Sequence, residues 1–157
     1  MHFLNLKKQH GVALLEVLIA VVVLSIGLLG VAALQTSALR NNQSSLERSL
    51  AVIQSYSILE AMRADVAVAR APTLGYNMAL TSTPPTGGNL IQTSQRQWIT
   101  DIQAALNDPG ARGAINCNAG NVCTITITWN DSRGGVLEND GTTTGDAAQT
   151  FTTMGRI

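Results

Sequence analysis

Apolar residues dominate the N-terminal part of the chain. From Val12 to Leu34 the only clearly polar side chains are those of Glu16 and Ser25. At ~1.5 Å per residue, a helix over this stretch spans roughly 34 Å, and a bilayer core is about 30 Å thick. We therefore predict that residues 12–34 form a membrane-spanning helix.

Basic residues lie ahead of this stretch. Lys7 and Lys8 precede it, and residues 1–11 contain no acidic side chain. Because basic residues beside the first apolar segment favour a cytoplasmic N-terminus, we expect the chain after Leu34 to be exported. A secretory signal peptide is the weaker interpretation, since its apolar region usually covers about 7–15 residues.

The helical pattern continues beyond the apolar stretch. Apolar residues recur mostly at intervals of three and four, at Leu39, Leu46, Leu50, Ile53, Leu59, Met62 and Val66. This spacing predicts an amphipathic helix over residues 35–71 whose apolar stripe packs against a core. The charged residues expected on its wetter face are Glu47, Arg48, Glu60, Arg63 and Asp65. Pro72 is expected to end one helix running from Val12 to about Arg70.

Residues 72–157 have the patterns of a small mixed domain. Proline and paired glycines predict an exposed loop from Thr81 to Gln95. A short helix is expected from Gln97 to Leu106, because Trp98, Ile102 and Leu106 recur at helical spacing. Such a helix would pack on a sheet.

The sheet itself is predicted from alternation. Val122 to Trp129 alternates apolar residues with threonines, which is typical of a half-buried strand. A second strand is expected over Gln149–Ile157, and another short strand is expected to begin over Val136–Glu138. The expected fold class is therefore α+β, with a long N-terminal helix packed on a small antiparallel sheet.

Length and charge limit the number of domains and the kinds of partner that we expect. With the apolar stretch set aside, the remainder of 157 residues suffices for one modest domain. The ten basic and ten acidic residues balance, so the chain has no basic surface of the kind that binds nucleic acid. Nucleic acid is therefore not expected among its partners.

Residues suited to catalysis are sparse. The two histidines, His2 and His10, both lie within the first eleven residues. No Ser-His or Cys-His pair is expected beyond them, and no glycine-rich stretch matches a phosphate-binding fingerprint. Four carboxylates could in principle pair for acid–base chemistry, but their spacing gives no evidence for it, and we expect loop or cap residues: Asp101, Asp108, Asp131 and Asp140. We expect no enzyme activity, catalytic residue, cofactor or metal.

The chain has two cysteines, Cys117 and Cys123. In an exported domain, an even and closely spaced pair favours a disulfide. Reduced thiols and a metal site are the alternatives, although zinc normally takes three or four protein ligands.

Glu16 is the anomaly of the apolar stretch. Placing an acidic side chain at the centre of a membrane helix costs ~2.5–3.5 kcal/mol, and somewhat less near its end. Such a residue usually marks a function or a partner. The plainer interpretation is that its side chain reaches the cytoplasmic headgroups.

The residues from Gly11 to Ala20, behind a short basic leader, resemble the class III signal of type IV pilins and pseudopilins. The resemblance implies that residues 1–11 are a leader and that a prepilin peptidase cleaves between Gly11 and Val12 and methylates Val12. Glu16 then becomes the fifth residue of the mature chain. It is placed to pair with the Val12 amine of a neighbouring subunit, and this pairing would select the correct register during assembly.

Two segments, Leu15–Ala20 and Leu24–Gly30, resemble in particular the PilV family of minor type IV pilins, also called type IV pilus modification proteins. The chain differs from major pilins at Val12, where phenylalanine is usual, and at Ala33, where many have proline. The resemblance implies a pilin-like fold and a structural subunit that initiates or modifies the fibre, with twitching motility or surface attachment following.

The resemblance also implies partners and location. The expected partners are the prepilin peptidase, other major and minor pilins through the N-terminal helix, and the inner membrane before assembly. The head, residues 72–157, would be periplasmic and later part of the pilus at the cell surface. Two alternatives remain: a minor pseudopilin of a type II secretion system, and a single-pass membrane protein with an exported binding or catalytic head.

Overall fold

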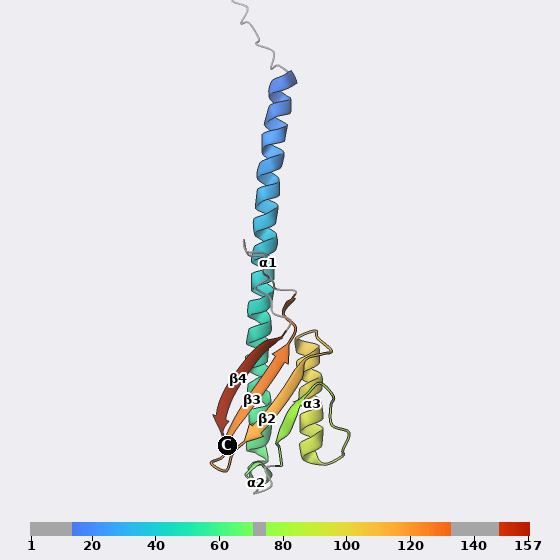
Figure 1. Ribbon diagram of the computed structural model, residues 1–157, viewed down its shortest axis with the longest axis vertical. Coiled ribbons are helices and arrows are strands. Elements are labelled where there is room, and N and C mark those ends of the chain that lie inside the picture. The colour runs from blue at the N-terminus through green and yellow to red at the C-terminus, as the bar shows by residue number, and fades with distance from the viewer. Residues whose placement is uncertain (1–13, 71–74, 133–147) are drawn as a thin grey trace, which may run out of the picture. The chain divides into compact units, whose positions relative to one another are not determined.

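The computed structural model describes residues 14–70, 75–132 and 148–157. The helices are α1 (Leu14–Ala64), α2 (Val66–Ala69) and α3 (Leu90–Ala105). The strands are β1 (Met78–Thr81), β2 (Arg112–Cys117), β3 (Val122–Trp129) and β4 (Gln149–Arg156) (Figure 1). This is the predicted α+β class: a long, apolar N-terminal helix and a four-stranded antiparallel sheet, which together make a pilin-like architecture.

The chain divides into two compact units, residues 1–38 and residues 39–157. Helix α1 contributes Leu14–Ala38 to the first unit and Leu39–Ala64 to the second. By length and composition, α1 is able to cross a membrane.

The long helix ends earlier than predicted. It stops at Ala64 rather than near Arg70, and Asp65 leaves the helical region with φ −118° and ψ 47°. The aspartate side chain competes for hydrogen bonds with nearby backbone groups, and the β-branched Val66 and Val68 have low helix propensity. The helix therefore ends at this point. The one-turn helix α2 follows. The predicted stop at Pro72 lies outside the described residues.

The four strands pair in the order in which they occur in the chain, β1-β2-β3-β4, and all pairs are antiparallel. β3 matches its prediction residue for residue, with alternate side chains buried, and β4 ends one residue before the predicted limit. β1 and β2 were not predicted from the sequence. β1 has only four residues, and β2 places Gly113 where a large apolar side chain would have marked the buried face. Val136–Glu138 lies outside the described residues.

Two helices cover one face of the sheet (Figure 1). Leu59 of α1 lies against Gly155 of β4, where an added Cβ would come within 2.9 Å of its methyl groups. Trp98 of α3 lies against Gly113 of β2, where the corresponding distance is 2.6 Å. The two helices are joined by the Trp98 indole, which donates to the Gln54 carbonyl at 2.8 Å. Small residues in the strands therefore allow both helices to approach the sheet closely.

Helix α3 begins earlier than the sequence suggested. The loop predicted for Thr81–Gln95 is helical from Leu90 onwards. The cause is an N-cap, because the Asn89 side chain accepts a hydrogen bond from the Gln92 backbone N–H at 2.8 Å. Asn89 was a usable signal, but the neighbouring prolines and glycines dominated the prediction.

The face of α1 that packs on the sheet also differs from the prediction. Its buried residues are Glu47, Ala51, Ser55, Ile58, Leu59 and Met62. Leu59 and Met62 were placed correctly, whereas Leu39, Leu46 and Ile53 are 58–69% exposed and Val66 is 38% exposed. Glu47 was expected on the wetter face and is 5% exposed. Small residues such as Ala51 and Ser55 let the helix sit close to the sheet, so hydrophobicity alone does not mark the buried face.

Candidate functional site

Glu16 lies in the first turn of α1, and its side chain is exposed. Within the part of the chain that the structure describes, it forms neither a hydrogen bond nor an ion pair. The predicted cleavage residues, Gly11 and Val12, lie outside the described residues. The proposed pairing of Glu16 with an amine of another subunit stays a prediction.

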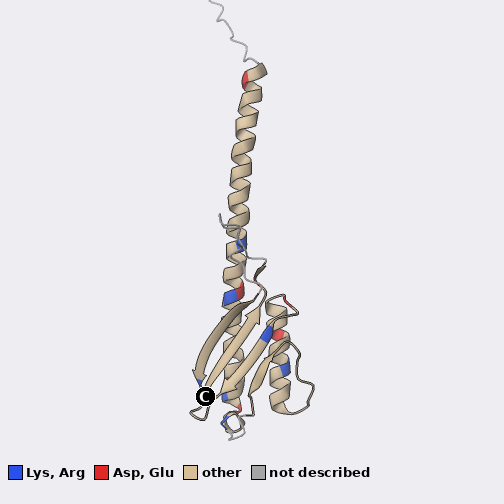
Figure 2. Cartoon of the chain, viewed as in Figure 1, with Lys and Arg blue, Asp and Glu red and all other residues tan. Residues whose placement is uncertain are grey.

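The residues around Glu16 form a continuous apolar surface. Large apolar side chains of α1 in the first unit are all more than half exposed, namely Leu14, Leu15, Val17, Leu18, Ile19, Val21, Val22, Val23, Leu24, Ile26, Leu28, Leu29, Val31 and Leu34. Figure 2 shows this N-terminal half of α1 almost without charged residues. Apolar surface of this extent requires lipid or other helices to cover it.

A second apolar surface lies on α1 within the second unit. Leu39, Leu46 and Ile53 recur at seven-residue intervals and therefore share one face of the helix. Leu50 lies beside this face but is half-buried and packs against the core of the head, as the sequence predicted. We call Leu39, Leu46 and Ile53 the outward stripe. It faces away from the residues that α1 packs on the sheet, and apolar side chains with seven-residue spacing are typical of contacts between helices.

Polar contacts fix α1 to the end of β3. The Trp129 indole donates a hydrogen bond to Glu47 Oε2 at 3.0 Å, and the Ser44 hydroxyl donates to Asp131 Oδ2 at 2.6 Å. Asp131 is 2% exposed, and its Oδ1 has no partner among the described residues. These contacts were not predicted from the sequence, although a strand that ends on tryptophan needs an acceptor for its indole N–H.

Cys117 and Cys123 form the predicted disulfide. They lie directly opposite each other in β2 and β3, at the closed end of the hairpin. The intervening turn is held by the Asn118 side chain, which accepts from the Gly120 and Val122 backbone N–H groups at 2.9 and 3.1 Å. The bond therefore fixes a hairpin in the sheet.

Asp108 and Asp101 have structural contacts. Asp108 accepts hydrogen bonds from the backbone N–H groups of Gly110 and Asn130, at 2.8 and 2.9 Å, as expected for a loop residue. Asp101 accepts from Gln97 at 2.7 Å along α3, and Asp140 lies outside the described residues. Among described residues, no group of three or more His, Cys, Asp or Glu side chains could hold a metal ion.

Comparison with known proteins identifies the N-terminal segment. Residues 6–32 match the prokaryotic N-terminal methylation motif. No curated protein and no solved structure gives a significant match to the chain.

The motif and the fold together define a class. A class III prepilin signal leads into a long apolar helix, and an antiparallel sheet packs on the C-terminal part of that helix, which supports a type IV pilin-like protein. The motif implies processing by a prepilin peptidase and assembly with other pilins, and the helix fits membrane anchoring. The matched motif ends at residue 32 and does not single out the PilV family within this class.

Proposed function

We propose that the chain is a minor type IV pilin of the PilV kind, a structural subunit that helps to initiate or modify a pilus and has no enzyme activity. One observation carries this proposal: the methylation motif over residues 6–32 leads directly into a helix whose apolar side chains are exposed all round. A subunit that assembles through its helix needs both features.

Processing gives Glu16 its role in the proposal. Cleavage between Gly11 and Val12 would leave an amine at the start of the mature chain, four residues before Glu16. In an apolar bundle of helices, an unpaired carboxylate is unfavourable, whereas an amine from the next subunit would compensate its charge. The pairing would therefore favour one register between subunits.

The outward stripe supports assembly from the second unit. Leu39, Leu46 and Ile53 are exposed, although α1 buries another face against its own sheet. In the proposal, the helices of neighbouring pilins cover this stripe. Before assembly, Lys7 and Lys8 would keep the leader cytoplasmic, with the head in the periplasm.

The test compares Glu16→Ala with wild type in the cell. The N-terminal mass should show that both precursors are cleaved before Val12. Incorporation of Glu16→Ala into sheared fibres should fall on the order of 100-fold, because leaving one partner of a buried ion pair uncompensated costs about 3 kcal/mol or more. Glu16→Gln should behave like Glu16→Ala, and Ser25→Ala, on the same helix, serves as the control.

Two results would contradict the proposal. Mature chains that begin at Met1 would show that the motif is not processed, and normal incorporation of Glu16→Ala would show that the pairing is unnecessary. Deleting the protein must also reduce surface pili. A defect confined to protein secretion would instead assign the subunit to a pseudopilus.

A further inference from the structure

β4 lies at one edge of the sheet formed by the described strands, and the backbone groups that it directs away from β3 can be assigned. The Ile157 N–H donates to the Asn121 carbonyl at 3.0 Å, and this pair continues the β3–β4 register. Because hydrogen-bonded pairs alternate in an antiparallel ladder, the even-numbered residues of β4 direct their N–H and C=O groups away from β3. At Thr150, Thr152 and Met154 these outward groups have no partner within the described part of the chain.

The two edges of the sheet are built differently. β1 has four residues, and its register with β2 shifts between Met78 and Thr81. Short length and irregular pairing are devices that keep an edge from binding another strand. β4 has eight residues in continuous register and contains neither proline nor lysine. Of the two edges formed by the described strands, β4 therefore offers the regular one for strand addition.

A groove accompanies the β4 edge on the side of α1. Its volume is about 350 Å³, and its lining includes Arg48, Val52, Trp129 and Phe151. Alternate side chains of a strand added to β4 would point toward α1, because side chains alternate between the two faces of a sheet. The groove lies on that face and offers Val52 and Phe151 to an apolar side chain.

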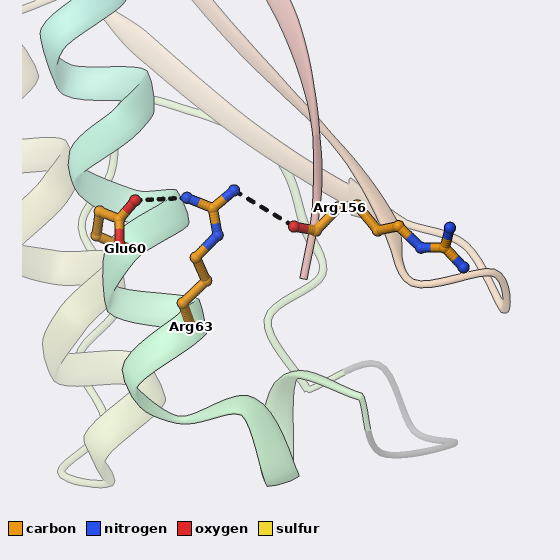
Figure 3. Close-up of polar contacts among 3 residues, drawn as sticks. All are labelled: Glu60, Arg63 and Arg156. Carbon is orange, nitrogen blue, oxygen red and sulfur yellow. Dashed lines mark hydrogen bonds and ion pairs between the residues drawn. The ribbon is translucent and has the colours of Figure 1, made fainter.

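Basic side chains lie at both ends of the edge. Arg48 contacts Gln149 at 3.5 Å, and within the described residues neither Arg48 nor Arg156 contacts a carboxylate. Arg63 is engaged, since it pairs with Glu60 and donates to the Arg156 carbonyl at 3.4 Å (Figure 3). The Arg156 side chain points away from this pair (Figure 3). β4 itself has no acidic residue.

This charge distribution disfavours a second copy of the chain as the occupant. Two β4 edges in antiparallel pairing would bring Arg48 of one copy near Arg156 of the other, and parallel pairing would bring like residues together. Like charges across an interface select against that partner. An acidic strand would instead meet complementary charge at both ends.

We propose that β4 binds an extended acidic segment of another polypeptide by strand addition. The backbone of that segment pairs with the outward groups of Thr150, Thr152 and Met154. One of its apolar side chains enters the groove beside Val52, and its carboxylates face Arg48 and Arg156. This interaction does not require fibre assembly, so it stands or falls separately from the proposed function.

The test uses the full chain in detergent micelles and two synthetic probes. Both are nine-residue peptides of alternating valine and threonine, one with glutamate and the other with lysine at both ends. Fluorescence anisotropy should show at least about tenfold tighter binding of the glutamate peptide. Hydrogen exchange at the Thr150, Thr152 and Met154 amides should slow when that peptide is bound.

Thr152→Pro removes one outward N–H and no bond to β3, and edge strands tolerate proline at such positions. This variant should weaken glutamate-peptide binding by about tenfold or more, whereas Thr152→Ala, which keeps the N–H, should bind as wild type. Arg48→Glu, a surface change that leaves β4 intact, should reduce the preference for the glutamate peptide.

Several outcomes would overturn the proposal. These are no binding, equal binding of both peptides, unchanged exchange at the three amides, or full binding by a folded Thr152→Pro variant. If the chain self-associates through an interface that Thr152→Pro abolishes, the occupant is a second copy and the proposal is wrong. A Thr152→Pro variant that fails to fold leaves the exchange and Arg48→Glu measurements to decide.

Discussion

At the scale of single residues, Glu16 and Glu47 show how the surroundings of a carboxylate decide its role. Glu16 is exposed on an apolar helix, and its side chain has no hydrogen-bond or ion-pair partner among the described residues. Glu47 is buried and accepts a hydrogen bond from the Trp129 indole at 3.0 Å. A buried carboxylate is tolerated only when it is paired or hydrogen-bonded, so Glu47 stabilises the head from within.

Tyr76 gives a prediction about alkaline pH. Burial raises the pKa of its hydroxyl, the Ser94 hydroxyl opposes the shift, and the Asp65 carboxylate adds to it. Because the folded-state pKa is raised, the contribution of neutral Tyr76 is fully present below about pH 10 and is lost as the pH rises through the folded-state pKa. The free energy of unfolding in micelles should therefore fall less between pH 8 and about pH 10.5 for Tyr76→Phe than for wild type.

Tyr56→Phe is the matched control for this measurement, because Tyr56 is 54% exposed on α1. Its pH dependence should follow that of wild type. If Tyr76→Phe also followed wild type, the ionisation of Tyr76 would not be linked to unfolding.

Some site residues were predictable because local sequence defines them. The two cysteines are closely spaced, and their predicted disulfide is present. Gly11, Val12 and Glu16 occur within one matched motif, and their roles in processing and assembly stay predictions. Glu47, Ser44 and Asp131 were not predictable as a group, since the hydrogen bonds join residues more than 80 positions apart. Those contacts depend on the fold of the whole head.

At the scale of elements, the contact between α3 and β2 depends on the absence of a side chain at Gly113. An added Cβ would lie 2.6 and 2.8 Å from atoms of Trp98 and Ile99, which are both buried. Gly113→Ala should therefore lower the free energy of unfolding by about 1–3 kcal/mol. Thermal or denaturant unfolding in micelles measures the change.

Gly88→Ala is the control for that change, because an added Cβ there has no atom within 4 Å. It should leave stability nearly unchanged. Equal stability of Gly113→Ala and wild type would mean that α3 shifts without cost.

Elements with strong periodicity were the predictable ones. The apolar stretch of α1 and the alternation of β3 each extend over eight or more residues. β4 was also predicted, although its sequence has no such alternation. The buried face of α1 was not predictable, since Ala51 and Ser55 allow the helix to approach the sheet closely but give little hydrophobic signal in the sequence. The end of α1 before Asp65 was not predictable either, because no glycine or proline lies there.

At the scale of the whole molecule, the outward stripe should contribute to assembly into fibres but little to the stability of the folded subunit. Leu46 and Ile53 are more than half exposed, so replacing both by asparagine should change the unfolding free energy of the subunit by less than about 1 kcal/mol. The same double variant should enter sheared fibres less well, because the apolar contact between helices is lost. Unfolding in micelles and immunoblots of fibres measure the two effects.

Asn41→Ala is the control, since Asn41 is exposed on α1 and, two residues from Leu39, lies on another side of the helix. It should enter fibres as wild type does. Wild-type incorporation of the double variant would mean that neighbouring helices do not use this surface.

The strand order has a consequence for how the head is made. Because spatial order follows chain order, each strand pairs with one that is adjacent in the sequence. Only the β2–β3 pair is a tight hairpin among the described strands, since β1 pairs with β2 across α3 and β3 pairs with β4 across residues 130–148. Local contacts form quickly, whereas pairing across a long connection is slower. The most distant contacts are those from α1 to the end of β3 and to β4. We therefore expect the β2–β3 hairpin to form first, with β1, β4 and α1 adding to it later.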